Sequence, residues 1–195
     1  MATSPLLERL KEREREVGRS VALPVNPKKS WLVCASAGLA AELLLPNVLR
    51  RMILFPLFPL ALLRVELPIP MYRTVFSVSL GSMCGLATVA AGFYVRHQAK
   101  VEFERAQTPS NFSDVESLAT TGCLSYTRNP LYLAGALIHV GVSMLLECPF
   151  LLLSIIPQLL YLQFVVVPNE EALLTRLFPT EFQKYCNRTP RWLFF

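Results

Sequence analysis

The 22 residues from Thr74 to Val95 limit the fold more than any other stretch, because none of them is charged and Arg73 and Arg96 bracket them. A helix needs about 20 mostly apolar residues to cross the hydrocarbon core of a bilayer. Basic residues commonly mark the ends of such helices. The stretch therefore predicts a transmembrane helix, and its many small residues predict close packing against neighbouring helices.

The rest of the chain also predicts a membrane protein. Of its 195 residues, 53% are hydrophobic, against about 45–50% in soluble domains, and the mean hydropathy is +0.41. The runs Trp31–Leu45 and Met52–Leu63 are each short for a span, so they predict one crossing or two. We expect an all-α, multi-pass integral membrane bundle of 4–5 spans, with a polar segment at residues 1–29 and one membrane domain at 30–195.

A helical hairpin is predicted near the C-terminus. Two apolar runs, Leu131–Leu146 and Pro149–Val167, are separated only by Glu147 and Cys148. Two crossings place the polar connection 96–128 and the tail 169–195 on the same side of the membrane, so both can contribute to one site. Basic residues in both segments predict that this side is cytoplasmic. His139, within the first arm, is either functional or simply hydrogen-bonded to a neighbouring helix.

The segment Gly122–Gly135 reads G-C-L-S-Y-T-R-N-P-L-Y-L-A-G. Its Asn129-Pro130 pair predicts a helix start, because the residue before a proline disfavours the α region and proline is tolerated in a first turn. Free N–H groups at a helix N-terminus suit an anion such as a carboxylate, and Arg128 adds a positive charge. The alternative is an ordinary membrane helix with a snorkelling arginine.

The tail predicts a second polar element. Asn169, Glu170 and Glu171 are typical of a helix N-terminus, and the following leucines and aromatic residues predict an amphipathic helix at the membrane interface. The five cysteines form no C-x-x-C pair and there are only two histidines, so no metal site is expected. Basic residues cluster at the edges of apolar runs, which favours membrane anchoring over nucleic-acid binding.

The two motifs together resemble a known family. R-N-P-L-Y-L-A-G, then a hairpin, then E-E-A-L-L-x-x-L-F-P-x-x-F-x-x-Y-x-x-R-x-P-R is similar to the isoprenylcysteine carboxyl methyltransferase family, whose wider group includes the membrane phospholipid methyltransferases. The similarity covers about residues 117–193. Departures are Asn129 for the usual histidine, Pro179 for a glycine, and Val166 where prenylcysteine enzymes carry an arginine.

The resemblance implies an enzyme that uses S-adenosylmethionine (SAM) as methyl donor, built mainly on residues 116–193. The cofactor residues it implies are Leu124, Asn129, Pro130, Leu131, Tyr132 and Glu170. Candidate substrate-contacting positions are Val166, Arg128 and Arg191, and no catalytic residue is assigned.

The resemblance also implies the acceptor. The first choice is the carboxylate of a C-terminal prenylated cysteine on a lipidated protein. The alternative is a phospholipid headgroup or another lipidic amine. The presence of Val166 in place of the arginine favours the amine. Two further alternatives are a non-catalytic membrane scaffold and a sterol-reductase relative that uses a nicotinamide cofactor. The expected location is the endoplasmic reticulum in a eukaryote or the inner membrane in a bacterium, with SAM entering from the cytosol.

Overall fold

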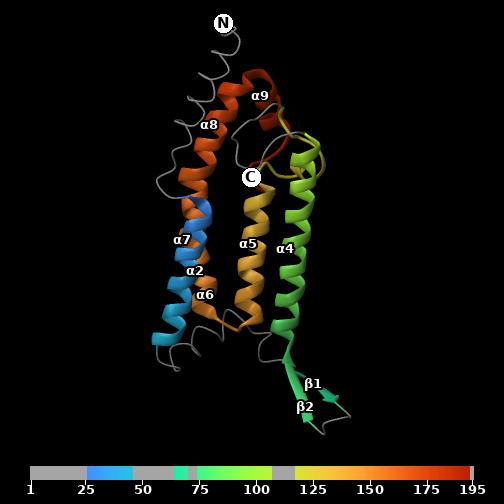
Figure 1. The fold of residues 1–195 in the computed structure, drawn as a ribbon, viewed down its shortest axis with the longest axis vertical. Coiled ribbons are helices and arrows are strands. Elements are labelled where there is room, and N and C mark those ends of the chain that lie inside the picture. Colours follow the sequence, from blue (N-terminus) through green and yellow to red (C-terminus); the bar gives the residue numbers. More distant parts are fainter. Residues whose placement is uncertain (1–25, 46–63, 70–73, 107–116, 194–195) are drawn as a thin grey trace, which may run out of the picture. The chain divides into compact units, whose positions relative to one another are not determined.

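The computed structural model describes residues 26–45, 64–69, 74–106 and 117–193, and these form two compact units. The motif unit includes Val95–Leu131 and Tyr161–Phe195, and the helix unit comprises Pro27–Tyr94 and Tyr132–Leu160. Figure 1 locates their elements along the chain. The predicted apolar run Met52–Leu63 lies outside the described residues.

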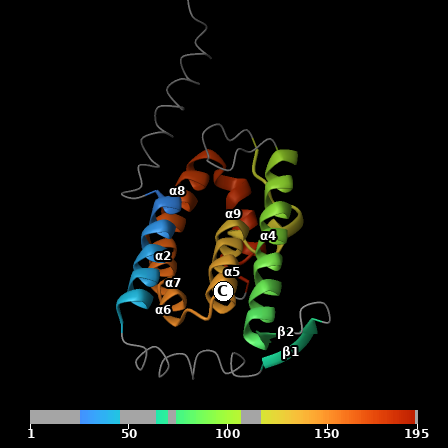
Figure 2. The same cartoon turned by 60° about the horizontal axis from the view of Figure 1, so that its bottom comes forward.

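Helix α2 (Pro27–Leu44) contains the first apolar run and packs against α6 (Pro149–Leu153). The two lie side by side in Figures 1 and 2. Gly38 makes this contact possible, because a Cβ there would approach the Leu151 Cα to 2.9 Å. The large hydrophobic side chains on the outer face of α2 are exposed, with Leu43 at 86%. Exposed apolar surface of this kind is typical of a face that meets lipid or another protein.

The prediction of one transmembrane helix over Thr74–Val95 is wrong at both ends. Strand β1 (Arg64–Ile69) pairs antiparallel with β2 (Thr74–Ser79), so the expected all-α fold contains a short β-hairpin. Half of the residues in T-V-F-S-V-S are β-branched, and its last four alternate apolar and polar residues, which favours a strand.

Helix α4 (Leu80–Arg105) begins after the strand and continues through ten residues that were assigned to a polar connection. Those residues are mostly good helix formers, so the helix does not end where its hydrophobicity ends. The prediction of close packing is confirmed within the helix unit. A Cβ on Gly85 would lie 2.6 Å from the Leu145 backbone nitrogen, and one on Gly141 would lie 2.7 Å from that of Val89.

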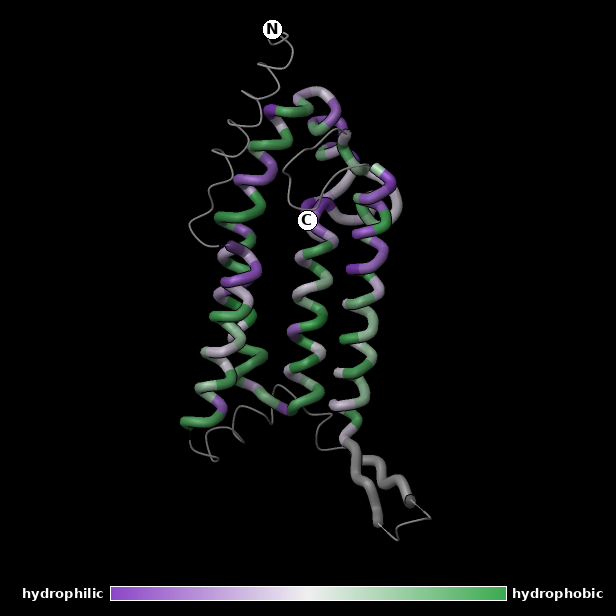
Figure 3. Tube along the Cα trace, viewed as in Figure 1, coloured by the Kyte–Doolittle hydropathy of each residue, from purple (hydrophilic) through white to green (hydrophobic). Residues whose placement is uncertain are grey.

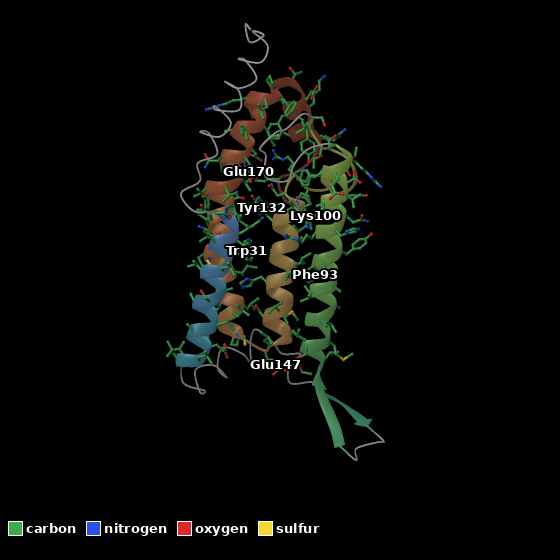
Figure 4. All side chains as sticks on the ribbon, in the orientation of Figure 1. Trp31, Phe93, Lys100, Tyr132, Glu147 and Glu170 are labelled. Atoms are coloured by element: carbon green, nitrogen blue, oxygen red, sulfur yellow. The ribbon has the colours of Figure 1, made fainter. Side chains whose placement is uncertain are left out.

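The helical hairpin is confirmed. Helix α5 (Pro130–Leu145) is followed by a turn in which Glu147 has a φ of 53°, and Figure 4 labels Glu147 there. The Cys148 backbone N–H donates to the Ser143 carbonyl at 2.9 Å, closing the end of α5. Figure 3 shows hydrophobic residues along most of α5.

The contacts of His139 distinguish between its two alternatives. His139 is 8% exposed, and its Nε2 lies 2.7 Å from the Leu151 carbonyl oxygen, so this nitrogen is the donor. Its ring also lies 5.4 Å from the ring of Trp31, centroid to centroid. These contacts favour the structural alternative, a hydrogen bond between neighbouring helices.

The second arm of the hairpin runs further than predicted. Helices α6, α7 (Ile155–Tyr161), a π-helical segment (Leu162–Val166) and α8 (Val167–Leu177) form one helical run from Pro149 to Leu177. Among the described helices, this run alone is long and apolar enough to cross a membrane, with a mean hydropathy of 2.2 over its most apolar window.

The predicted helix start at Asn169 is therefore wrong, because the chain is already helical there. Pro168 has no N–H for the Phe164 carbonyl, four residues back. The helix accommodates this by widening: the Val167 N–H bonds to the Leu162 carbonyl, five residues back. The helix thus passes through a proline that would be expected to mark its start.

The tail contains two helices where one was expected. Helix α8 ends at Leu177, and α9 (Pro179–Arg188) follows after Phe178, whose backbone is not helical. Pro179 stands at the start of α9, where its fixed φ suits the first turn. The proline that departs from the family pattern therefore begins a helix in this chain.

Candidate functional site

The loop before α5 is anchored to the end of α4 within the motif unit. The Thr121 hydroxyl donates to the Glu102 carboxylate at 2.6 Å, and Arg105 forms an ion pair with the same side chain at 2.8 Å. Gly122 follows with a φ of 59° and lies against Glu102, whose Cδ would be 2.6 Å from a Cβ. Glycine is required here by both backbone conformation and space. A short 3₁₀ helix, η2 (Gly122–Ser125), then leads toward the motif.

The same loop is joined to the C-terminal tail. The buried Tyr185 hydroxyl of α9 donates to the Leu124 carbonyl at 2.7 Å. The Arg128 backbone N–H donates to the Pro190 carbonyl at 3.0 Å. The Arg191 carbonyl accepts from the Thr127 hydroxyl and from the Asn129 side-chain amide, both at 3.0 Å. The expectation that the motif and the tail meet is thus confirmed by direct contacts.

A third set of contacts ties the tail to the second hairpin arm. The Trp192 indole N–H donates to the Gln163 side-chain oxygen at 2.7 Å, and Gln163 belongs to the π-helical segment. The C-terminal segment 189–192 therefore contacts both the loop before α5 and the helix that leads into α8.

The charged centre of the motif unit is Glu171 on α8. Its Oε1 lies 2.9 Å from Nη1 of Arg128, and its Oε2 lies 2.5 Å from Nη2 of Arg191. Arg191 Nε also donates to Oε1 at 3.1 Å, which completes a bidentate contact. Two guanidinium groups thus share one carboxylate, which leaves one positive charge in excess. We call these three residues the Glu171 cluster.

The Glu171 cluster is largely shielded from solvent. The side chains of Glu171 and Arg128 are 19% and 15% exposed. Arg128 also donates to the Cys186 sulfur at 2.7 Å, while its buried Nε has no hydrogen-bond partner within the described structure. Hydrogen bonding to Glu171 raises the pKa of Arg191, and burial raises that of the Cys186 thiol despite the nearby guanidinium. Cys186 is therefore not an activated nucleophile at neutral pH.

An open hollow of about 440 Å³ lies between α8 and α9 beside this cluster. It is lined by Glu171, Ala172, Thr175, Pro179, Phe182, Gln183 and Cys186. Figure 3 shows hydrophobic and hydrophilic residues alternating along α8, as an amphipathic helix requires.

The residues predicted for the cofactor lie on three segments. Leu124 is 2% exposed in the 3₁₀ helix and Asn129 is 8% exposed just before α5. Pro130 begins α5 and Leu131 follows it. Glu170 is half-buried on α8. The motif unit thus places five of the six predicted residues on segments that contact each other through the tail.

Tyr132 is the next residue of α5 and belongs to the helix unit. Figure 4 labels Tyr132 on α5 and Glu170 on α8. The first turn of α5 contains no acidic residue, so its N–H groups are not neutralised by a side chain of that turn. The cofactor residues that the resemblance implies thus include the start of a helix whose first turn carries no acidic side chain.

The role of the three candidate substrate positions stays a prediction. Val166 is completely buried, and Arg128 and Arg191 are both paired with Glu171. Sequence reasoning missed Glu171, Tyr185 and Cys186. A partial signal for Glu171 was available, because two arginines predicted for one site favour a carboxylate nearby. Glu171 is one of several acidic residues that the prediction left without a role.

No set of three or more metal-ligating side chains gathers anywhere in the part of the chain that the structure describes. The arrangement is instead a polar loop, a helix start and an acidic amphipathic helix, followed and preceded by apolar helices. In the described residues, this polar arrangement is accompanied by one long apolar helical run, Pro149–Leu177.

Comparison with known proteins agrees. The phospholipid methyltransferase family matches residues 80–181, which is more than half of the chain. The chain therefore belongs to this family, part of the superfamily of isoprenylcysteine and phospholipid membrane methyltransferases. No curated protein and no solved structure matches the chain significantly.

Proposed function

We propose that this membrane methyltransferase takes its methyl group from SAM and transfers it to the amine of a phospholipid headgroup or another lipidic amine. Family membership supports methyl transfer, and the substrate class rests on two observations. The two arginines that could receive a substrate carboxylate are already neutralised in part by Glu171. Val166, where prenylcysteine enzymes carry the cation, is apolar and buried.

The donor site is proposed at the start of α5. The N–H groups of the first turn of α5 suit the carboxylate of SAM. Glu170 suits its amino group or ribose hydroxyls, while Leu124 supplies apolar contact; the resemblance adds Tyr132, the residue after Leu131, to this set. The bound cofactor supplies an electrophilic methyl group on a positively charged sulfur. The proposed contacts with SAM involve only the residues named above, and none of them acts as a metal ligand.

The chain's own contribution is positional. An acceptor amine, protonated at neutral pH, must first release a proton to water. Its lone pair then forms the new carbon–nitrogen bond as the carbon–sulfur bond breaks, and S-adenosylhomocysteine leaves with that bond's electron pair. The protein gains rate by holding the two reactants in line and by excluding water. An acceptor held in the bilayer suits the exposed apolar faces of the helix unit.

A carboxylate acceptor remains the second candidate, because the E-E-A-L-L and P-R motifs of the tail resemble those of the prenylcysteine enzymes. The cluster also retains one excess positive charge. A carboxylate is already ionised at pH 7 and needs no base.

The decisive experiment offers both acceptors in parallel. Membranes containing the protein receive SAM labelled in its methyl group together with phosphatidylethanolamine or acetylfarnesylcysteine. Base-stable label on the phospholipid supports the proposal, and base-labile label on farnesylcysteine replaces it with the second candidate. Label on neither acceptor, with no SAM binding, favours a non-catalytic scaffold.

Glu170→Ala serves as the matched blank. Losing a charged hydrogen bond is worth about 1.5–3 kcal/mol, so SAM affinity should fall about tenfold or more. Tyr132→Ala should weaken SAM binding in the same direction. Unchanged SAM affinity in Glu170→Ala would remove Glu170 from the donor site.

A further inference from the structure

We propose that Glu171 is a positioning residue for the methyl-donor site. It holds the loop before α5 and the C-terminal tail in fixed register against α8. This inference rests on the donor site proposed above and assigns a role to the acidic residue beside Glu170. From helical spacing alone, Glu171 points about 100° away from Glu170 and has no expected role.

The geometry links the two halves of the proposed site through adjacent residues. Glu171 follows Glu170 on α8, and Arg128 precedes Asn129 at the start of α5. The 2.9 Å ion pair between the side chains of Glu171 and Arg128 therefore links α8, which carries Glu170, to the start of α5. A shift of either segment changes the distance between Glu170 and the first turn of α5.

Arg191 makes the connection three-way. Its guanidinium binds Glu171 in a bidentate contact, while its carbonyl accepts from Thr127 and Asn129. One residue of the tail thus contacts α8 with its side chain and the motif loop with its backbone. Arg191 transmits the position of Glu171 to the proposed cofactor residue Asn129.

Removing the carboxylate leaves two like charges close together in a site that is less than one-third exposed. Their repulsion and the need to hydrate them separate the loop from the tail. Many loop contacts stay intact, because the Tyr185 and Pro190 hydrogen bonds do not involve Glu171. The expected result is a displaced donor site in a protein that remains folded.

The test compares Glu171→Gln, Glu171→Asp and the control Glu181→Gln in purified, detergent-solubilised full-length protein. Glu181 is an exposed acidic residue in the first turn of α9. SAM affinity is measured by titration calorimetry, and folding is followed by the unfolding midpoint and by gel filtration. We expect Glu171→Gln to weaken SAM binding at least tenfold, Glu171→Asp to recover part of that loss, and Glu181→Gln to match the wild type.

A double-mutant cycle with Arg191→Gln supplies a readout that a purely structural role does not move. If Glu171 acts through Arg191, the two substitutions should affect SAM affinity less than additively. Wild-type affinity in Glu171→Gln would overturn the inference. So would a variant that unfolds more easily while its folded fraction binds SAM normally.

The failure of the inference and that of the proposed function remain distinguishable. If the wild type binds SAM and Glu171→Gln binds it equally well, only the positioning role fails. If the wild type itself binds no SAM, the proposed donor site is wrong and the positioning role fails with it.

Discussion

Replacing Tyr185 by phenylalanine tests the contact between the tail and the motif loop with the smallest possible change. The substitution removes one hydroxyl and keeps the ring, whose packing against Phe182 has a centroid separation of 6.3 Å. The hydroxyl donates to the Leu124 carbonyl at 2.7 Å. Tyr185 is 4% exposed and Leu124 is 2% exposed, so water does not readily replace the lost partner.

The magnitude follows from that burial. A typical intramolecular hydrogen bond contributes about 0.5–1.5 kcal/mol, whereas a buried acceptor left unpaired costs about 1–3 kcal/mol. Tyr185→Phe should therefore lower the free energy of unfolding by about 1–3 kcal/mol. Since Leu124 is a proposed cofactor residue, SAM affinity should also fall, although by less than in Glu170→Ala.

The assay is equilibrium unfolding in detergent micelles, with Tyr126→Phe as the matched control. Tyr126 lies in the same loop and is 72% exposed, so its substitution should change stability by no more than about 0.5 kcal/mol. If Tyr185→Phe is as stable as Tyr126→Phe, the hydrogen bond to Leu124 does not hold the loop and the reasoning is refuted.

Three further predictions follow from local geometry. Gly122→Ala should destabilise the protein by at least about 1 kcal/mol, because a φ of 59° is costly for alanine and Glu102 occupies the space; an unfolding midpoint equal to that of the wild type would contradict this. Gly141→Ala should separate α5 from α4 and lower the unfolding midpoint, since its Cβ would lie 2.7 Å from the Val89 nitrogen, whereas the exposed Ala90→Ser in α4 should not. Burial raises the pKa of Tyr185, so the folded state favours the neutral phenol; stability should be retained below pH about 10 and decline above it as the unfolded chain ionises first, and this decline should be smaller in Tyr185→Phe.

The sequence predicted the features that depend on local chemistry. The helix start at Asn129-Pro130, the tight turn at Glu147 and the packing of small residues were all confirmed. Each follows from rules that act within a few residues, such as the backbone limits of proline or the lack of a side chain on glycine. The predicted hairpin also led us to expect that the motif and the tail meet, and their hydrogen bonds confirm this contact.

The errors came from places where a local signal competed with a longer-range one. Hydrophobicity alone did not separate the strand Thr74–Ser79 from the helix that follows it. Asn169 and the two glutamates after it predicted a helix start, but the chain is already helical there because the π-helical segment accommodates Pro168. The role of Glu171 depends on Arg128, 43 positions before it, and Arg191, 20 positions after it. Helix periodicity does not predict that these two residues lie close to Glu171.

Because of the π-helical segment Leu162–Val166, a one-residue deletion in the second hairpin arm should have different effects before and after Pro168. A π turn holds one residue more than an α turn, so deleting a single residue there can restore an α turn and leave α8 facing the same way. A deletion after Pro168 instead rotates the rest of α8 by about 100°, which puts Glu171 where Glu170 stood and turns the next residue, Ala172, toward Arg128. The same one-residue deletion is thus absorbed before Pro168, whereas after Pro168 it moves both glutamates by one helical position and leaves no carboxylate facing Arg128.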